Sequence, residues 1–374
     1  MSNTKMSRNI YFAFLTVFLT AALFTGCGKN ESDHHAGEKT SENDAASGEM
    51  TVILPGNVKL ELVKVEAGTF EMSARDKVTE DYKEDNSKQP FVIVDDEGNI
   101  DDDSMLSLLF ENEVPHQATL TRDFYLGRTE VTQAQWKAVM GSNPSNFTGD
   151  NRPVEQVSWH NAMEFCGKLN ELKLAPDGWR FTLPTETQWE FAARGGNRSK
   201  GYKFSGSDTA DEVAWYDDEF NSETGTHPVG QKKPNELGLY DMSGNVCEWC
   251  LDDWIDDSSE LKPEFVRGND SSKELRPLRG GGWDWTARSC RSGTRMDGNP
   301  DIGRLLTDIG FRLALVPESY WGDLSASPHP LPLSGRLRAG SQRGSGKDAL
   351  RVRRMGVSSS LKGIHVPVAF RRIG

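Results

Sequence analysis

Three glycine- and aromatic-rich blocks between Gly230 and Arg312 decide the fold: GQKKPNELGLYDMSGNVCEW at 230–249, PLRGGGWDW at 277–285 and DIGFRLAL at 308–315. No long helical pattern separates them. Glycine permits positive φ and close backbone approach, and tryptophan supplies the buried area that a loop-rich core otherwise lacks. The stretch therefore predicts a domain built mainly from loops, whose backbone polar groups need a dense side-chain network or a bound ion.

Short strands and helices are predicted upstream of this stretch. Apolar and polar residues alternate from Thr51 to Met72, with turn residues at 55–57 and at Gly68, and this pattern predicts two strands. Three helix starts follow, each marked by a capping side chain, and the second helix also has an apolar face. The capping residues are Thr132 with Gln135, Ser158, and Thr185 with Gln188.

Four upstream blocks complete an ordered set: VEAGTFEM at 65–72, TEVTQAQWKAVM at 129–140, PVEQVSWHNAMEFC at 153–166 and LPTETQWEFAARGG at 183–196. With the first three blocks they resemble the domain of the formylglycine-generating enzyme (sulfatase-modifying factor) family, over residues 51–316. The resemblance implies an α+β fold that is irregular, loop-rich and C-type-lectin-like, with short strands and two or three helices.

The first 26 residues resemble a bacterial export signal. Residues 10–26, IYFAFLTVFLTAALFTG, are apolar, follow Lys5 and Arg8, and end beside Cys27, a junction similar to a lipoprotein cleavage and lipidation site. An uncleaved N-terminal membrane anchor is the alternative. Either way the domain is exported, so we expect a membrane-anchored lipoprotein of the bacterial cell envelope, lipidated at Cys27, that faces the periplasm or the cell surface.

Polar segments flank and interrupt the domain. Residues 27–50 are too poor in bulky apolar side chains to order themselves and are predicted to be a disordered tether. An acidic insertion is predicted at about 75–113, and a basic tail rich in Pro, Ser, Gly and Arg at 317–374, mostly disordered. The net charge of −13 in 374 residues disfavours a nucleic-acid-binding body.

The family's enzymes carry two cysteines five positions apart after the RGG block, and the resemblance implies that this pair binds one copper ion. Soft Cu(I) prefers two thiolates. Here Trp285, which has no metal-ligand atom, stands at the first position, and Cys290 stands at the second. Aligning Arg291 and Arg295 with the family's later arginine pair moves Cys290 off the site altogether. Copper is therefore not expected, and Cys290 is the one candidate catalytic residue.

The remaining cysteines are predicted to be buried structural side chains. Cys247 and Cys250 form a CxxC, but no second CxxC accompanies it and it does not open a helix after a strand. Cys166 lies on the apolar face of the second predicted helix and is expected to face the core.

The block GLYDMSGNVCEW leaves two interpretations open. The resemblance implies a structural Ca²⁺ bound by the carbonyls of Ser243, Gly244 and Val246 and by the carboxylate of Glu248, and hard Ca²⁺ prefers such oxygen ligands. The alternative is a tight Gly-Asn turn with Glu248 paired to an arginine. Buried ion pairs are expected among the charged residues of the apolar blocks: Arg279, Arg291, Arg295, Arg312, Glu190, Asp241 and Glu248.

Three functions are compatible with the resemblance. The favoured one is a binding or scaffold module that has lost the copper-binding pair, with other envelope proteins or a sulfatase as partners. The alternatives are an active oxidase that converts a sulfatase Cys or Ser to formylglycine, and a non-heme iron oxidase. The iron enzyme needs clustered histidines, whereas His116, His160 and His227 are isolated in the sequence.

Overall fold

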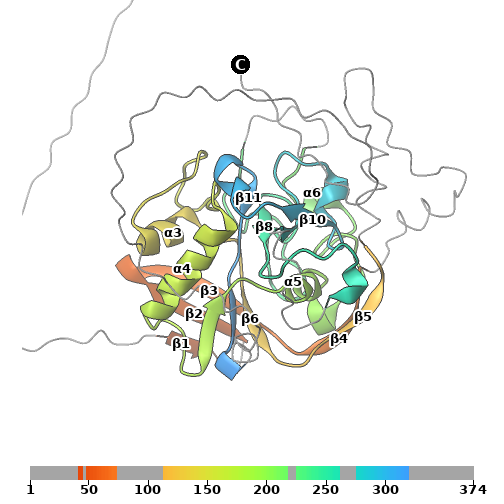
Figure 1. Ribbon diagram of the computed structural model, residues 1–374, viewed down its shortest axis with the longest axis horizontal. Helices are drawn as coiled ribbons and strands as arrows, with labels where there is room; N and C mark the ends of the chain where they lie inside the picture. Colours follow the sequence, from red (N-terminus) through yellow and green to blue (C-terminus); the bar gives the residue numbers. More distant parts are fainter. Residues whose placement is uncertain (1–40, 45–47, 74–112, 218–224, 262–274, 320–374) are drawn as a thin grey trace, which may run out of the picture. The chain divides into compact units, whose positions relative to one another are not determined.

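The computed structural model describes residues 41–44, 48–73, 113–217, 225–261 and 275–319 (Figure 1). The predicted export signal, the lipidation position Cys27, and nearly all of the predicted acidic insertion and basic tail lie outside these ranges. None of the helices within them combines the length and the apolar character that crossing a bilayer requires.

The largest layer is a six-stranded antiparallel sheet in the order β1-β2-β3-β6-β12-β7. Strand β12, which begins within the last glycine-rich block, lies between β6 and β7, so the end of the domain completes a sheet begun at its start (Figure 1). The strands are β1 (Ser41–Asp44), β2 (Glu49–Leu54), β3 (Val58–Val65), β6 (Phe124–Gly127), β7 (Trp179–Thr182) and β12 (Ala314–Pro317).

Two smaller sheets hold the glycine-rich blocks and the first strand pair. The four-stranded sheet has the order β10-β9-β8-β11, in which β8 and β11 are parallel and the other pairs antiparallel. Its strands are β8 (Cys247–Trp249), β9 (Arg276–Arg279), β10 (Arg295–Gly298) and β11 (Ile309–Gly310), and the two-stranded sheet pairs β4 (Gly68–Met72) with β5 (His116–Leu120).

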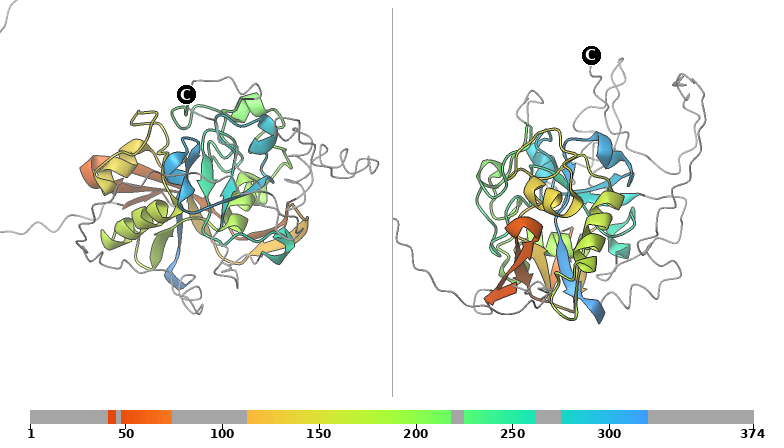
Figure 2. Two further views of the ribbon diagram at one scale, coloured as in Figure 1. Left: turned by 45° about the horizontal axis from the view of Figure 1, so that its top comes forward. Right: turned by 90° about the vertical axis from the view of Figure 1, so that its left-hand side faces the viewer.

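Helices α3 and α4 pack on the six-stranded sheet, while α5 lies between the two-stranded and four-stranded sheets (Figures 1 and 2). The α-helices are α3 (Gln133–Met140), α4 (Trp159–Glu171), α5 (Glu186–Ala193) and the single turn α6 (Ala210–Val213). Short 3₁₀ turns are η1 (Pro55–Asn57), η2 (Gly196–Arg198), η3 (Ser258–Glu260), η4 (Ala287–Cys290) and η5 (Ile302–Leu305).

The three predicted helix starts are confirmed. Thr132, Ser158 and Thr185 are the N-caps of α3, α4 and α5, and each closes a capping box with the residue three positions on. The apolar face of α4 buries Phe165 and Cys166, as the spacing predicts. The α+β, loop-rich class is likewise confirmed by short strands and few helices.

Three boundaries differ from the sequence-based expectation. Three strands, not two, form between residues 49 and 72, because the turn at Gly68 starts β4 as a separate pair with β5. Strand β1 at Ser41–Asp44 pairs with β2, so sheet structure begins inside the segment predicted as a tether. Glu113, predicted as the end of the insertion, is buried and paired with Arg291, so it belongs to the domain.

The cap of α3 gives a direct stability test. Replacing Thr132 by Ala removes the side-chain oxygen that accepts from the Gln135 N–H, and we expect a loss of about 1 kcal/mol in the free energy of unfolding. Thr132→Ser keeps the acceptor and is the control. Urea denaturation measures both, and equal midpoints for Thr132→Ala and the wild type would contradict this account of the cap.

Candidate functional site

The Gly-Asn turn before β8 is the point where four segments meet. Asn245 accepts from the His227 N–H at 2.8 Å and donates to a carboxylate oxygen of Glu130 at 2.7 Å, and its own N–H donates to the Trp215 carbonyl at 2.9 Å. A Cβ at Gly244 would lie 2.2 Å from the same Trp215 carbonyl oxygen, and Gly244 has φ +77°. Only glycine fits there.

Glu248, on β8, is the buried partner of Arg312. The Arg312 Nε–H and Nη2–H donate to its two carboxylate oxygens at 2.6 Å each, and the indole N–H of Trp189 donates to Oε2 at 2.7 Å. Arg312 also donates to the carbonyls of Gly127 and Tyr240. One guanidinium therefore joins β6, β8, β11 and the loop before the Gly-Asn turn.

Of the proposed calcium ligands, Ser243, Gly244 and Val246 lie in the turn and Glu248 follows on β8, where its carboxylate is engaged by Arg312. Both oxygens of Glu248 accept from Arg312, whose charge neutralises it. No group of three or more His, Cys, Asp or Glu side chains suited to a metal ion occurs in the described ranges. The Glu248–Arg312 pair matches the alternative of a Gly-Asn turn with an ion-paired Glu248. Calcium binding by the carbonyls of this turn stays a prediction.

Two further carboxylates surround this pair. Burial, reinforced by the negative charges of Asp241 and Glu248, raises the pKa of Glu130 well above its usual range. Burial likewise raises the pKa of Asp241 to about 6, although its carboxylate accepts from the Gly230 N–H. Three acids share one arginine here, which favours a protonated form for at least one of them near neutral pH.

Three other arginines repeat the pattern. Each is buried and forms an ion pair with a buried glutamate from a distant segment. Pairing of Arg279 with Glu190 is among the expected pairs, whereas Glu186 and Glu113 were not expected as partners. The pairs are Arg279 with Glu190, Arg295 with Glu186, and Arg291 with Glu113.

Trp285 occupies the position predicted for the first copper ligand. Its ring is half-buried, and its indole N–H donates to Oδ2 of Asp308 at 2.6 Å. A Cβ at Gly282 would lie 2.8 Å from the Trp285 ring and 3.0 Å from Cβ of Asp308, so the ring and the carboxylate are packed against this turn. Burial raises the pKa of Asp308, while the Trp285 bond opposes that rise.

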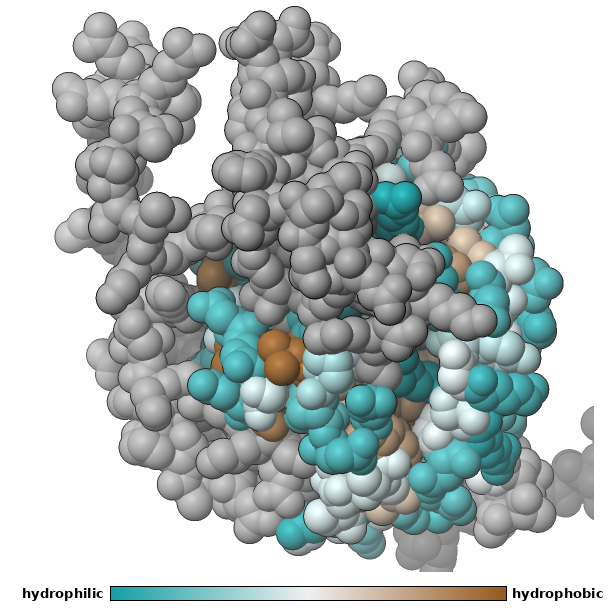
Figure 3. Space-filling view, turned by 90° about the vertical axis from the view of Figure 1, so that its right-hand side faces the viewer, coloured by the Kyte–Doolittle hydropathy of each residue, from teal (hydrophilic) through white to brown (hydrophobic). Residues whose placement is uncertain are grey.

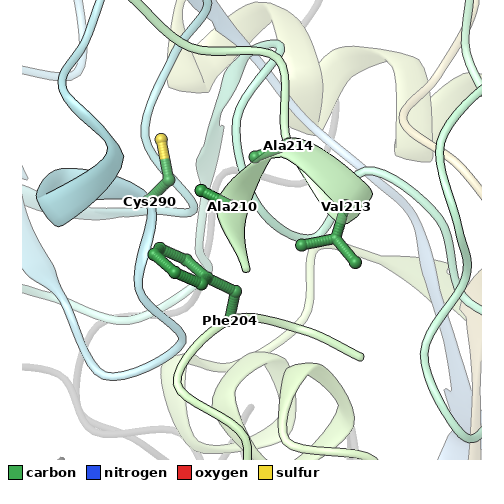
Figure 4. Close-up of a cluster of buried hydrophobic side chains, with 5 residues drawn as sticks. All are labelled: Phe204, Ala210, Val213, Ala214 and Cys290. Carbon is green, nitrogen blue, oxygen red and sulfur yellow. The ribbon is translucent and has the colours of Figure 1, made fainter. Parts of the chain in front are cut away.

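Cys290 ends the 3₁₀ turn η4 and has no exposed surface. It packs with Phe204, Ala210, Val213 and Ala214 in an apolar cluster around α6 (Figure 4). A thiol in such surroundings is shielded from a substrate, since reactive cysteines sit in accessible, electropositive sites.

Cys247, at the start of β8, is the thiol that the folded chain brings near Cys290. Both thiols lie beside Gly281: the Gly281 backbone hydrogen-bonds the Cys247 thiol, and a Cβ at Gly281 would lie 2.7 Å from the Cys290 sulfur. Burial raises the pKa of Cys247 well above its ordinary value. No local pattern indicates that both thiols lie beside this glycine, because 247 and 290 are far apart along the chain.

Glu155 organises the loop that follows α3. Its Oε1 accepts from the Phe147 N–H at 2.8 Å, and the Asn146 backbone also donates to the carboxylate. Within the described residues no donor meets its second oxygen, Oε2. Burial raises the pKa of Glu155 to about 7. Phe147 in turn packs edge-on against the ring of Trp283, with centroids 5.3 Å apart.

The three histidines lie on separate elements. His116 belongs to β5 and contacts the Val114 carbonyl, His160 is exposed on α4, and His227 stacks on Trp215 with ring centroids 3.7 Å apart. Burial and nearby positive charge lower the pKa of His227. The fold does not bring them together as a facial set of ligands.

Several site residues were missed by sequence reasoning. Glu130, Asn245, Glu186 and Glu155 each anchor a turn or an arginine, and each lies in a quoted block. The available signal was an acid or amide inside an apolar block, which is costly to bury without a partner. The identity of the partner required the fold.

Comparison with known proteins supports the assignment of the fold. The model of the family described as "Sulfatase-modifying factor enzyme 1-like domain" matches residues 54–316. The solved structure of Treponema denticola variable protein 1 superimposes with a TM-score of 0.55 and 30% identity, covering 72% of this chain and 99% of that one.

Three sequence relatives carry different names. "Chaperone protein LppX" of Paenibacillus barcinonensis is 40% identical over 205 residues, covering 43% of this chain and 69% of that protein. "Inactive C-alpha-formylglycine-generating enzyme 2" of Bos taurus is 30% identical, covering 55% and 64%, and the "Formylglycine-generating enzyme" of Thermomonospora curvata is 31% identical, covering 50% and 63%. The chain thus spans less than two thirds of the last two relatives.

Removing Arg312 tests the role of the central ion pair. Arg312→Met leaves Glu248 buried and uncompensated, and we expect a loss of about 3–5 kcal/mol in the free energy of unfolding. Arg304→Met is the matched control, because Arg304 and Asp301 are 58% and 68% exposed and such a pair contributes about 0–1 kcal/mol. Equal losses in chemical denaturation would contradict a structural role for the buried pair.

The raised pKa of Glu155 predicts that the stability of the fold depends on pH. Its pKa of about 7 lies above the ordinary 4.5, so the folded chain holds this proton more tightly than the unfolded chain. Its contribution to stability is then greatest below pH 4.5 and declines as pH rises to about 7. Glu155→Gln cannot ionise, so its melting temperature relative to the wild type should rise across that range. A difference that is flat with pH would contradict the shift.

Proposed function

The chain belongs to the sulfatase-modifying factor enzyme 1-like domain family, and from this premise we propose that it is a binding or scaffold module of the bacterial cell envelope. In this proposal Cys27 carries a lipid that holds the domain on the membrane, facing the periplasm or the cell surface. The domain uses the family architecture for contact with another exported protein, not for copper-dependent oxidation.

The observation that carries the proposal is the replacement of a thiol by Trp285. Its indole N–H is committed to Asp308, and Cys290 lies in an apolar cluster with no exposed surface. A side chain without a ligand atom and a thiol that substrate cannot reach do not fit a copper ion that must meet dioxygen and a substrate thiol. A protein that only binds a partner needs the family fold but not the copper site, so these observations fit a binding module.

The names of the relatives support a contact function. One relative is called a chaperone protein and another an inactive formylglycine-generating enzyme, so the family architecture occurs under names other than that of the oxidase. We propose by analogy with the chaperone protein that the partner is an exported polypeptide, such as a sulfatase or another envelope protein. On the face shown in Figure 3, the described residues that are visible are mostly hydrophilic, with small separate apolar patches among them.

An active oxidase is the second candidate, and one observation favours it. Cys247 lies near Cys290 in the fold, so a second thiol is present even though the position of the usual first thiol is Trp285. Relatives named formylglycine-generating enzyme are 31% and 30% identical to the chain. Both thiols are buried, however, and so are shielded from a substrate peptide.

Two assays on the full chain separate the candidates. The first incubates the chain with Cu(I), dioxygen and a peptide carrying a sulfatase cysteine motif, and mass spectrometry of the trapped aldehyde measures product. We expect none above the level without protein, and the enzyme of Thermomonospora curvata is the positive control. The second follows light scattering of a chemically unfolded exported sulfatase on dilution, and we expect the chain to reduce its aggregation at equimolar ratio.

The outcomes are distinct. Copper-dependent aldehyde that disappears in Cys290→Ser would replace the binding module by the oxidase. Reduced aggregation without aldehyde supports the binding module, with Cys166→Ser as a thiol control that should behave as the wild type. Neither aldehyde nor any effect on aggregation would overturn the proposed contact with exported polypeptides.

A further inference from the structure

Three buried hydrogen-bond donors in neighbouring loops have no acceptor among the described residues. They are Nη1 of Arg152, the indole N–H of Trp215 and the hydroxyl of Thr226, a residue with no exposed surface. Most buried donors in folded proteins meet an acceptor, because leaving one unpaired costs stability. Three unpaired donors in one region therefore indicate a missing acceptor.

Arg152 also lacks a counter-charge. Its side chain is half-buried, and within the described ranges it forms neither an ion pair nor a side-chain hydrogen bond. The buried guanidiniums of Arg279 and Arg312, by contrast, each bind a buried glutamate. An arginine keeps its charge in proteins, so Arg152 calls for an anion that the described residues do not supply.

Two contacts join the chain around Thr226 to the loop that leads to Arg152. A Cβ at Gly225 would lie 2.4 Å from the ring of Phe147, so the residue before Thr226 packs on that loop. The N–H of Val229 donates at 2.8 Å to the carbonyl of the residue before Arg152. The two segments thus lie side by side from one contact to the other.

The side chain of Arg152 lies in the same region. It folds back over Gly149, where a Cβ would lie 3.1 Å from Cδ and 3.4 Å from Nε of the arginine. Burial lowers the pKa of His227, and the positive charges of Arg152 and Lys232 lower it further, which agrees with this placement. Arg152 therefore lies beside the segment that carries Thr226 and His227.

Trp215 and Lys232 complete the cluster. The Trp215 ring stacks on His227, and Nζ of Lys232 lies 4.1 Å from the centroid of the same ring. Lys232 also donates to the carbonyl of Asp211 at 2.8 Å, which holds its ammonium group in place. Among the described residues no carboxylate pairs with either Lys232 or Arg152, so the surroundings attract a negative charge.

We propose that Arg152, Trp215 and Thr226 form a binding site for a carboxylate group. A carboxylate has two oxygens with about four lone-pair sites, so it accepts from a guanidinium and from neutral donors together. One unpaired guanidinium matches its single negative charge, whereas Lys232 already has the Asp211 carbonyl as a partner. This balance favours a carboxylate over a doubly charged sulfate or phosphate.

Two sources carry such a group: a small carboxylic acid, and an acidic side chain of a polypeptide. The shared chemistry is the oxyanion, and the experiment below distinguishes the sources. The inference concerns this site alone and goes beyond the proposed contact function.

The test is a titration of the full chain with sodium acetate at constant ionic strength, with sodium chloride as the balancing salt. The indole N–H signal of Trp215, assigned with Trp215→Phe, is followed by nuclear magnetic resonance. We expect a shift that saturates, because the bound oxygen takes up this donor. The absence of a saturable shift, or tighter binding of sulfate than of acetate, would overturn the proposal.

A short blocked peptide with a central glutamate, compared with the same peptide carrying glutamine, identifies the source. Tighter binding of the glutamate peptide than of acetate assigns the site to a polypeptide ligand. Acetate binding that exceeds binding of the glutamate peptide assigns it to a small acid. A glutamine peptide that binds as well as the glutamate peptide would contradict recognition of a carboxylate.

Variants separate binding from stability. Arg152→Met should weaken acetate binding by about tenfold to a hundredfold, the effect of losing a hydrogen bond to a charged group. Its melting temperature should equal or exceed that of the wild type, because the guanidinium has no partner in the free chain. Thr226→Val should weaken binding as well, and Arg198→Met, an exposed position on η2, should bind as the wild type does.

The contrary results are equally clear. Wild-type affinity in Arg152→Met would overturn the proposal. A large fall in its melting temperature would show that the guanidinium has a structural partner, and would also count against the site. Arg152→Lys keeps the charge but loses the planar fork, so it should fold and bind acetate with an affinity between those of the wild type and Arg152→Met.

Discussion

The buried pair of Arg312 and Glu248 is the interaction on which the loop-rich half of the molecule depends. Glycine-rich loops bury carbonyl and N–H groups that no helix or regular sheet satisfies, and each unsatisfied group costs stability. Arg312 presents five donors in a fixed plane, and it uses them on Glu248, Gly127 and Tyr240 at once. A single guanidinium thereby fixes β8 and the loop at Tyr240 relative to the end of β6 in the six-stranded sheet.

The same solution recurs through the core. Arg279, Arg291 and Arg295 each bind a buried glutamate, so four arginine–glutamate pairs take the place that an ion or regular backbone pairing has in other folds. Removing two charges from water is expensive, and only close, multiply bonded geometry offsets that cost. The pairs consequently specify one arrangement of the loops. In this arrangement both carboxylate oxygens of Glu248 accept hydrogen bonds from Arg312.

The properties of Trp285 and Cys290 follow from how the turn after RGGG packs against its neighbours. Trp285 fills the space beside Gly282 and binds Asp308, while Cys290 turns into the cluster around α6. An aromatic side chain and a buried thiol stabilise the turn after RGGG, whereas an oxidase needs accessible sulfur at the same place. Packing and copper chemistry are competing uses of this turn, and the proposed function assigns these contacts to packing.

Local signals in the sequence determined the α+β class, the three capped helices and the burial of Cys166, because capping boxes and apolar periodicity act within a few residues. They also identified the arginines that pair, but not all of their partners: Glu186 and Glu113 lie more than a hundred residues from Arg295 and Arg291. Likewise, only the tertiary structure showed that Cys247 and Cys290 both lie beside Gly281 and that Glu248 pairs with Arg312. Such contacts depend on how distant loops pack against one another, and no short-range sequence pattern encodes the distance between residues of different loops.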